Sequence, residues 1–137
     1  MGGLNLYEIE EKLIDYIVNT QYEDIPTEVI ATAKKLTLTI MGTTIAGAML
    51  EGCEALVEQI KGWGGKEEAS ILLHAGKVPA HNAALVNSYM ARALDSDDGI
   101  RPGMHVGASA VPAALAASEL AGGCTGKEFL TALVVGA

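Results

Sequence analysis

Apolar residues recur every three or four positions along most of this chain, and proline or clustered glycine interrupts the recurrence at intervals. Near the N-terminus, for example, one helical face carries Leu6, Ile9, Leu13, Tyr16 and Ile17. Such spacing places side chains on one face of an α-helix, whereas strands alternate with a period of two. The pattern therefore predicts an all-α fold of about six packed helices with at most a token strand.

Start and stop signals set the expected limits of these helices. They are expected at residues 6–20, 26–49, 53–63, 79–95, from 107–109 to the glycines at 122 and 123, and from 125 to the end of the chain. Pro26 and Pro79 suit the first turn of a helix, where a missing amide hydrogen costs little, and Pro112 is assigned the same place in the fifth helix. Capping boxes are expected at two helix starts, Asn5 with Glu8 and Thr125 with Glu128. Residues 69–73 are expected to be briefly extended.

A long uncharged stretch, residues 36–50, lies in the second expected helix. It falls short of the ~20 residues that span a bilayer, so no membrane partner is expected. The second half of this helix is apolar or small on every side, which predicts deep burial. Gly42, Ala46 and Gly47 would let a neighbouring helix approach closely.

Composition limits the partners that this chain can have. The formal net charge is −8, with nine Lys and Arg residues and no basic cluster, so nucleic acid is not an expected partner. Cys53 and Cys124 stand far apart, which argues against a disulfide framework and fits a cytoplasmic location. No pair of histidines has metal-ligand spacing, so no metal site is expected. The sequence also lacks dinucleotide-binding, P-loop and serine-hydrolase motifs.

The densest polar group in the sequence follows the fourth expected helix. Asp95, Asp97 and Asp98 fall within four residues, and a glycine-rich loop with Arg101 and His105 comes next. The dipole at the C-terminal end of a helix disfavours negative charge, so helix stability does not explain these acids. They could bind a cation, transfer protons or orient a substrate, or they could form a solvated acidic loop. Their spacing does not fit an EF-hand loop.

His105 is the main titratable candidate in the loop, because imidazole exchanges protons near neutral pH. A surface histidine without a function is the alternative. Arg101 could hold a substrate carboxylate, whereas Arg92, on the helix, could do the same or only pair with a neighbouring aspartate. His74 and His81 are interpreted as structural.

The region around these residues resembles a known family. Residues 83–119, AALVNSYMARALDSDDGIRPGMHVGASAVPAALAASE, are similar to the N-terminal helical region of the MmgE/PrpD family, whose motif runs A-A-x-x-N-G-x-x-x-H-x-L-D-F-D-D-T before a loop with H-P. Residues 25–47, 64–88 and 125–137 resemble other segments of that region, in the same order. The family includes 2-methylcitrate dehydratase, cis-aconitate decarboxylase and iminodisuccinate epimerase.

The resemblance implies a fold and an assembly. Family members are longer and pair an all-helical domain with a smaller lid domain, usually as homodimers. Residues 1–137 would then form a single, partial helical domain without the lid, and the uncapped apolar end at Ala137 agrees with a partial domain. Apolar faces left open on residues 30–50 and 129–137 would drive association into a homo-oligomer.

The resemblance also implies a reaction. The family's catalytic aspartate falls on Asp95 and its loop histidine on His105. The implied chemistry is cofactor-free removal of a proton α to a carboxylate of a small di- or tricarboxylate substrate, followed by dehydration, decarboxylation or epimerisation. Arg101, Asp98 and Gly99 are expected to bind the substrate.

Departures from the family motif leave the choice of substrate open. Arg92 stands where a histidine is common, Ser96 replaces an aromatic residue, and Gly99 replaces a threonine. Asp97 is interpreted, with Asp98, as holding the loop through hydrogen bonds. A stand-alone helical module for oligomerisation or partner binding is the alternative function.

Overall fold

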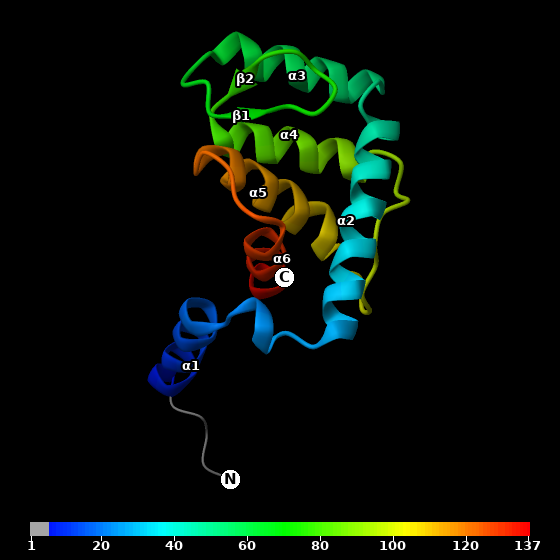
Figure 1. Ribbon diagram of the computed structural model, residues 1–137. Coiled ribbons are helices and arrows are strands. Elements are labelled where there is room, and N and C mark those ends of the chain that lie inside the picture. Colours follow the sequence, from blue (N-terminus) through cyan, green and yellow to red (C-terminus); the bar gives the residue numbers. More distant parts are fainter. Residues whose placement is uncertain (1–5) are drawn as a thin grey trace.

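The structure, a computed structural model, describes residues 6–137, and helices make up most of them (Figure 1). The helices are α1 (Leu6–Asn19), α2 (Thr27–Gly47), α3 (Glu51–Trp63), α4 (Ala80–Arg92), α5 (Val106–Leu120) and α6 (Gly126–Gly136), with a 3₁₀ turn, η1 (Tyr22–Asp24), after α1. Two short strands, β1 (Ala69–Ser70) and β2 (Lys77–Val78), form a hairpin. The predicted all-α architecture is confirmed for the described residues. The capping box expected at Asn5 lies outside them.

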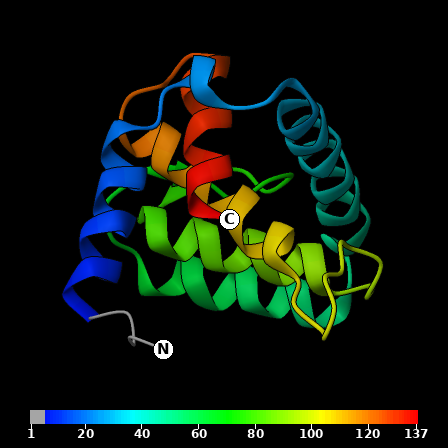
Figure 2. The ribbon, with the colours of Figure 1, turned by 90° about the horizontal axis from the view of Figure 1, so that it is seen from below.

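Helices α3, α4 and α5 lie in successive layers, and α2 runs along one side of the stack (Figure 1). α4 occupies the middle and packs against α2, α3 and α5, while α6 contacts both α5 and α2. The view from below shows α1 and α2 at opposite edges, with α5 and α6 between them (Figure 2). The connection between α4 and α5, which carries the acidic residues, lies at the side where α2 passes.

Two apolar clusters hold these layers together. One lies between α3, the hairpin and α4 and includes Ile60, Ile71 and Met90. The other lies between α2, α5 and α6 and includes Ile40 and Leu133. Fully burying one such side chain stabilises the fold by roughly 1.5–3 kcal/mol, so packing between helices contributes more than helix propensity does.

Only part of the burial expected for α2 is observed. Gly47 is buried, and a Cβ added to it would collide with the Met90 carbonyl oxygen, which confirms the close approach expected there. The space around Gly42 is open, and Leu38 and Ile45 are exposed. The prediction of deep burial on every side is wrong because α4, α5 and α6 lie on one side of α2 (Figure 1).

The segment expected to be extended becomes one half of the hairpin. Ala69 pairs with Val78 and Ser70 with Lys77 in an antiparallel register. The sequence pattern does not predict β2, because two residues are too few to reveal a strand period. Contacts with α4 and α5 hold the hairpin in place.

α1 forms where the amphipathic pattern predicts a helix, yet none of its residues is buried. Its exposed apolar side chains are Leu6, Tyr7, Ile9, Leu13, Ile14, Tyr16, Ile17 and Val18. α6 shows the opposite outcome, since Leu130 and Leu133 are buried against α2 and α5. The open apolar face expected on residues 129–137 is therefore only partly observed, whereas the one expected on residues 30–50 is observed at Leu38, Ile45 and Met49. α1 adds an uncovered apolar face that was not expected.

Two further expectations concern the cysteines and the membrane. Cys53 is buried, Cys124 is exposed, and both are free thiols. Within residues 6–137, no single helix is long and apolar enough to span a membrane, and α2 and α3 meet that test only together, as a pair bent by 91°.

Candidate active site

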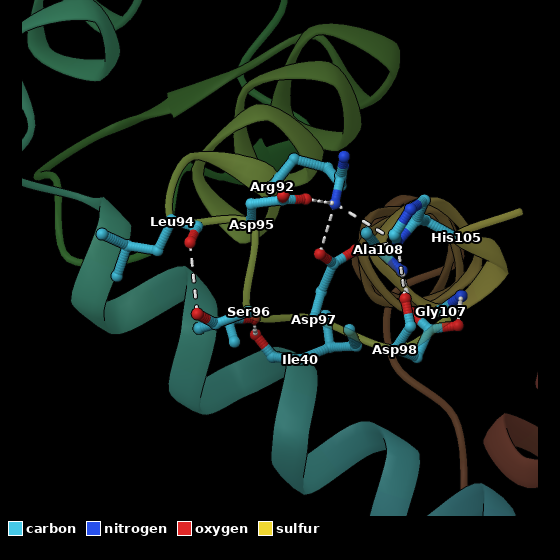
Figure 3. Close-up of polar contacts among 11 residues, drawn as sticks. Ile40, Arg92, Leu94, Asp95, Ser96, Asp97, Asp98, His105, Gly107 and Ala108 are labelled. Atoms are coloured by element: carbon cyan, nitrogen blue, oxygen red, sulfur yellow. Dashed lines mark hydrogen bonds and ion pairs between the residues drawn. The ribbon is translucent and has the colours of Figure 1, made fainter. Parts of the chain in front are cut away.

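The connection between α4 and α5 gathers the acidic residues, an arginine and a histidine into one place (Figure 3). α4 ends at Arg92, before the predicted end at residue 95, and the chain turns through Asp95 with a positive φ of 50°. Aspartate tolerates this left-handed conformation better than most residues. The loop then returns to α5, whose N-cap is His105. We refer to Arg92, Asp95, Asp97, Asp98 and His105 as the corner cluster.

Arg92 joins two of the aspartates. Its Nη1 donates to Asp95 Oδ1 at 2.8 Å and to Asp97 Oδ1 at 2.6 Å. The hydrogen bond to Asp97, followed by the one to Asp95, raises the pKa of the Arg92 guanidinium above its ordinary value. The interpretation that Arg92 pairs with a neighbouring aspartate is therefore confirmed.

The two carboxylates on Arg92 lie in different environments. The Asp95 side chain is 81% exposed, whereas the Asp97 side chain is fully buried. Asp97 Oδ2 lies 3.3 Å from His105 Nδ1, but it has no hydrogen-bond partner among the described residues. Buried carboxylate oxygens usually accept hydrogen bonds, so an unsatisfied one calls for a specific explanation.

The loop backbone orients the His105 ring. Its Nδ1 lies 2.6 Å from the carbonyl oxygen of Asp98 and 3.2 Å from Arg92 Nη1. A carbonyl oxygen only accepts, so the shorter contact requires a hydrogen on Nδ1. Arg92, which only donates, then cannot bond the same nitrogen. The neutral ring in this tautomer carries its lone pair on Nε2, the nitrogen that can take up a proton.

An open groove beside His105 has room for a small molecule. It measures about 560 Å³. Its lining includes His105, Met104, Val106, Ser109, Ala113 and, from α6, Gly136. A larger groove of about 690 Å³ lies between α1 and α6, and its lining includes no residue of the corner cluster. We place the candidate site at the smaller groove, because His105 of the corner cluster lines it.

Asp98 closes the start of α5. Its two carboxylate oxygens accept from the backbone amides of Gly107, at 3.0 Å, and Ala108, at 3.2 Å. Only glycine fits beside it, since a Cβ added to Gly107 would lie 2.6 Å from Asp98 Oδ1 and 2.5 Å from Leu36 Cδ1. Both oxygens of the Asp98 carboxylate thus accept hydrogen bonds from the backbone. The expected contact between Asp98 and the substrate stays a prediction.

This cap also explains where α5 begins. Because a carboxylate satisfies the first free amides of a helix and complements its dipole, Asp98 stabilises a start at Val106. Pro112 consequently lies in the second turn of α5, and its predicted place in the first turn is wrong. The cap comes from nine residues away, a separation that local capping patterns do not cover.

The other expected substrate contacts, Arg101 and Gly99, lie exposed in the loop. Ile100 and Met104 pair across a tight turn that presents Arg101. Within residues 6–137, the Arg101 side chain makes no hydrogen bond or ion pair, so the loop carries a cation without a carboxylate partner. The substrate-binding roles of Arg101 and Gly99 stay predictions.

The remaining histidines lie outside the corner cluster. His81 is exposed in the first turn of α4, and His74 lies in the hairpin loop with a buried Nε2 that lacks a hydrogen-bond partner. Among the described side chains, no group of three or more His, Cys, Asp or Glu residues is arranged to hold a metal ion. The residue that sequence reasoning undervalued is Asp97, whose burial no local pattern signals.

A comparison with known protein families finds a match that includes the corner cluster. A family model described as the MmgE/PrpD N-terminal domain matches residues 11–137. The matched range holds α2 to α6 and every residue of the corner cluster. No curated protein matches the chain. A family match over this much of the sequence establishes that the chain belongs to the MmgE/PrpD family.

Proposed function

We propose that this chain supplies part of the active site of a lyase or isomerase that removes a proton α to a carboxylate of a small di- or tricarboxylate, without a cofactor. The observation that carries the proposal is the orientation of His105, whose Nδ1 faces the Asp98 carbonyl oxygen and leaves the lone pair on Nε2. Asp95 provides a second titratable group on the same cluster. Membership of the MmgE/PrpD family supports an enzymatic role.

In the proposed reaction, His105 Nε2 takes the α-proton, and the C–H electron pair moves into the adjacent carboxylate as an enediolate-like anion. Expulsion of a β-hydroxyl group then gives dehydration, and return of a proton to the opposite face gives epimerisation. In the decarboxylation variant, carbon dioxide leaves and the resulting carbanion is protonated. Water supplies the returning proton, and Asp95 is proposed as the carboxylate that passes it on.

The negative charge of this intermediate requires a cation nearby. Arg92 already serves two carboxylates, Asp95 and Asp97. Arg101 has no such partner among the described residues, which supports it as the arginine that holds a substrate carboxylate.

Ligand binding gives the direct test. The 15N-labelled chain would be titrated with 2-methylcitrate, cis-aconitate and iminodisuccinate and followed by NMR. We expect saturable shifts at His105, Gly99 and Arg101 for at least one of the three, and we expect His105→Ala to weaken them. The exposed His81, changed to Ala, is the matched control and should bind normally. A chain that binds none of the three compounds would overturn the proposal.

Turnover gives a second test. In any form of the protein that converts substrate, Asp95→Asn or His105→Ala should lower kcat by ~10²-fold or more, the usual effect of losing an acid or base. The chain alone should convert little, because Asp95 is exposed and the groove is open, so water is not excluded. Robust conversion by the chain alone would contradict this reading of a partial site. Full activity of His105→Ala would remove His105 as the base.

α1 favours a second function, association through a stand-alone helical module. Its apolar side chains are exposed, and such faces associate in water. We propose a homo-oligomer that uses this face. Light scattering at tens of micromolar should report a dimer or larger mass, and Leu13→Glu/Ile17→Glu should lower it, whereas Glu10→Gln on the same helix should not. A monomeric wild-type chain would reject the homo-oligomer.

A further inference from the structure

We propose that Asp97 is a positioning residue that selects the tautomer of His105, with the hydrogen on Nδ1 and the lone pair on Nε2. The inference deepens the proposed function and rests on His105 acting there as the base. It starts from the carboxylate of Asp97, which is fully buried and has an oxygen, Oδ2, without a hydrogen-bond partner among the described residues. That oxygen lies 3.3 Å from His105 Nδ1.

Two groups compete for this one nitrogen. The Asp98 carbonyl oxygen, 2.6 Å away, can bond Nδ1 only if the nitrogen carries a hydrogen. Arg92 Nη1, 3.2 Å away, can bond Nδ1 only if the nitrogen is bare. Each contact therefore stabilises a different neutral tautomer, and only the first leaves Nε2 able to accept a proton.

Asp97 weakens the second contact. An arginine Nη1 carries two hydrogens. Asp97 Oδ1 takes one at 2.6 Å and Asp95 Oδ1 takes the other at 2.8 Å, so neither is left for His105. The pull of Asp97 is the stronger of the two, because its carboxylate is buried whereas that of Asp95 is screened by water.

The unpartnered oxygen of Asp97 acts in the same direction. A negative charge beside Nδ1 stabilises a hydrogen on that nitrogen and destabilises a lone pair there. This effect explains why an oxygen without a hydrogen bond is held at that position. Asp97 thus keeps Nε2 free for substrate without touching the substrate itself.

Long-range 1H–15N correlation NMR on the full chain, labelled with 15N-histidine, reads the tautomer directly. The buffer would be alkaline enough that the imidazoles are neutral, and His105→Asn would identify the signals. We expect wild-type His105 to carry its hydrogen on Nδ1. A wild-type ring with the hydrogen on Nε2 would overturn the proposal without any variant.

Variants of Arg92 and of the two aspartates that bind it separate a positioning role of Asp97 from a purely structural one. Asp97→Ala frees an Arg92 hydrogen, so the tautomer ratio should shift toward Nε2–H by roughly 10-fold or more, the effect of one hydrogen bond to a charged group. Asp97→Ala/Arg92→Met removes the competing donor as well and should restore Nδ1–H. Asp95→Ala also frees one Arg92 hydrogen, but it leaves the Asp97 charge beside Nδ1, so Nδ1–H should stay predominant.

Each outcome decides the proposal. It fails if Asp97→Ala keeps the wild-type tautomer, if the double variant does not restore it, or if Asp95→Ala shifts it equally. Far-UV circular dichroism and unchanged His74 and His81 signals would establish that the variants are folded. If Asp97→Ala does not fold, the isosteric Asp97→Asn takes its place with the same expected shift, because its amide would donate to a bare Nδ1. The tautomer is measured without substrate. A chain that binds no carboxylate would therefore overturn the proposed function without changing the tautomer result.

Discussion

Two polar clusters lie toward the two ends of α5, and they differ in how completely their hydrogen bonds are satisfied. The corner cluster contains His105, the N-cap of the helix. The other, which we call the hairpin cluster, contains Glu119 in the last turn with Ser70, Lys77 and Asn87. α4 contributes to both, through Arg92 and Asn87 respectively.

The hairpin cluster closes on itself. Glu119 accepts from the backbone amide and hydroxyl of Ser70, at 3.0 and 2.9 Å, and pairs with Lys77 at 2.9 Å. The buried Asn87 accepts from the Leu72 amide and donates to the Ser70 carbonyl oxygen. Networks with every member satisfied fix a unique packing. This cluster ties the hairpin to α4 and α5.

The corner cluster stays open. Asp97 keeps an unsatisfied buried oxygen, and Asp95 is exposed in a left-handed conformation. Such features cost free energy of folding and collect at functional sites. Hydrogen-bond satisfaction therefore distinguishes a structural polar cluster from a candidate site, although both clusters pair carboxylates with a basic side chain.

The largest effect is expected in the hairpin cluster. Asn87→Ala would leave the Leu72 amide and the Ser70 carbonyl oxygen without partners, at about 1–3 kcal/mol each, so we expect the free energy of unfolding to fall by about 3 kcal/mol. Urea unfolding measures this change in the free energy of unfolding. Asn82→Ala, on the same helix and outside both clusters, is the control. A loss below about 1 kcal/mol would mean that the hairpin cluster does not stabilise the fold.

Asp98 is the one member of the corner cluster with a clear stabilising role, and Gly107→Ala tests it. The added Cβ would displace the Asp98 carboxylate or Leu36, at a cost of about 2 kcal/mol. Gly99→Ala, in the loop before α5, has open space and should cost far less. Thermal unfolding of both variants would check this, and equal midpoints would show that the Asp98 cap carries little energy.

The pKa of Glu119 determines how pH affects the stability that the hairpin cluster contributes. Burial raises the pKa of this carboxyl, but hydrogen bonds from the Ser70 backbone and Lys77 outweigh it and leave the pKa below its ordinary value. A lowered folded-state pKa stabilises the protein above the unfolded value of about 4.3, and that stability is lost as pH falls through the folded value.

We therefore expect Glu119→Gln to cost about 1 kcal/mol at neutral pH and progressively less in acid. Urea midpoints measured from pH 7 down to about 3 would show the two curves converging. Glu58→Gln, an exposed residue on α3, should run parallel to the wild type throughout. Curves for Glu119→Gln that stay equally separated would contradict the assignment.

The smallest effect is expected at Asp95. Asp95→Gly relieves the left-handed strain and removes only an exposed ion pair, so stability should stay level or rise by about 0.5 kcal/mol. A catalytic role would make the same change harmful to turnover. Urea unfolding provides the measurement, and a loss of more than about 1 kcal/mol would place Asp95 among the stabilising residues instead.

Local signals in the sequence predicted most helix positions. Thr125 and Glu128 form the expected capping box, with bonds of 3.2 and 2.6 Å. Gly122 and Gly123 end α5 with positive φ values, as expected. The end of α4 and the start of α5 were harder to predict, because Asp98 caps α5 from a distant position in the loop. The sequence also placed Asp95 and His105 on one loop, and their catalytic roles stay predictions.

What the sequence by itself determined is what depends on neighbours along the chain: helix periodicity, caps, net charge and family membership. Tertiary structure alone decided which of three adjacent aspartates is buried, which one caps α5, and which apolar helix is covered. Asp95, Asp97 and Asp98 share a side-chain chemistry, so their differences arise from the groups that packing brings against each one. The same reason leaves α1 exposed, because amphipathicity gives a helix a face to bury but does not supply the surface that covers it.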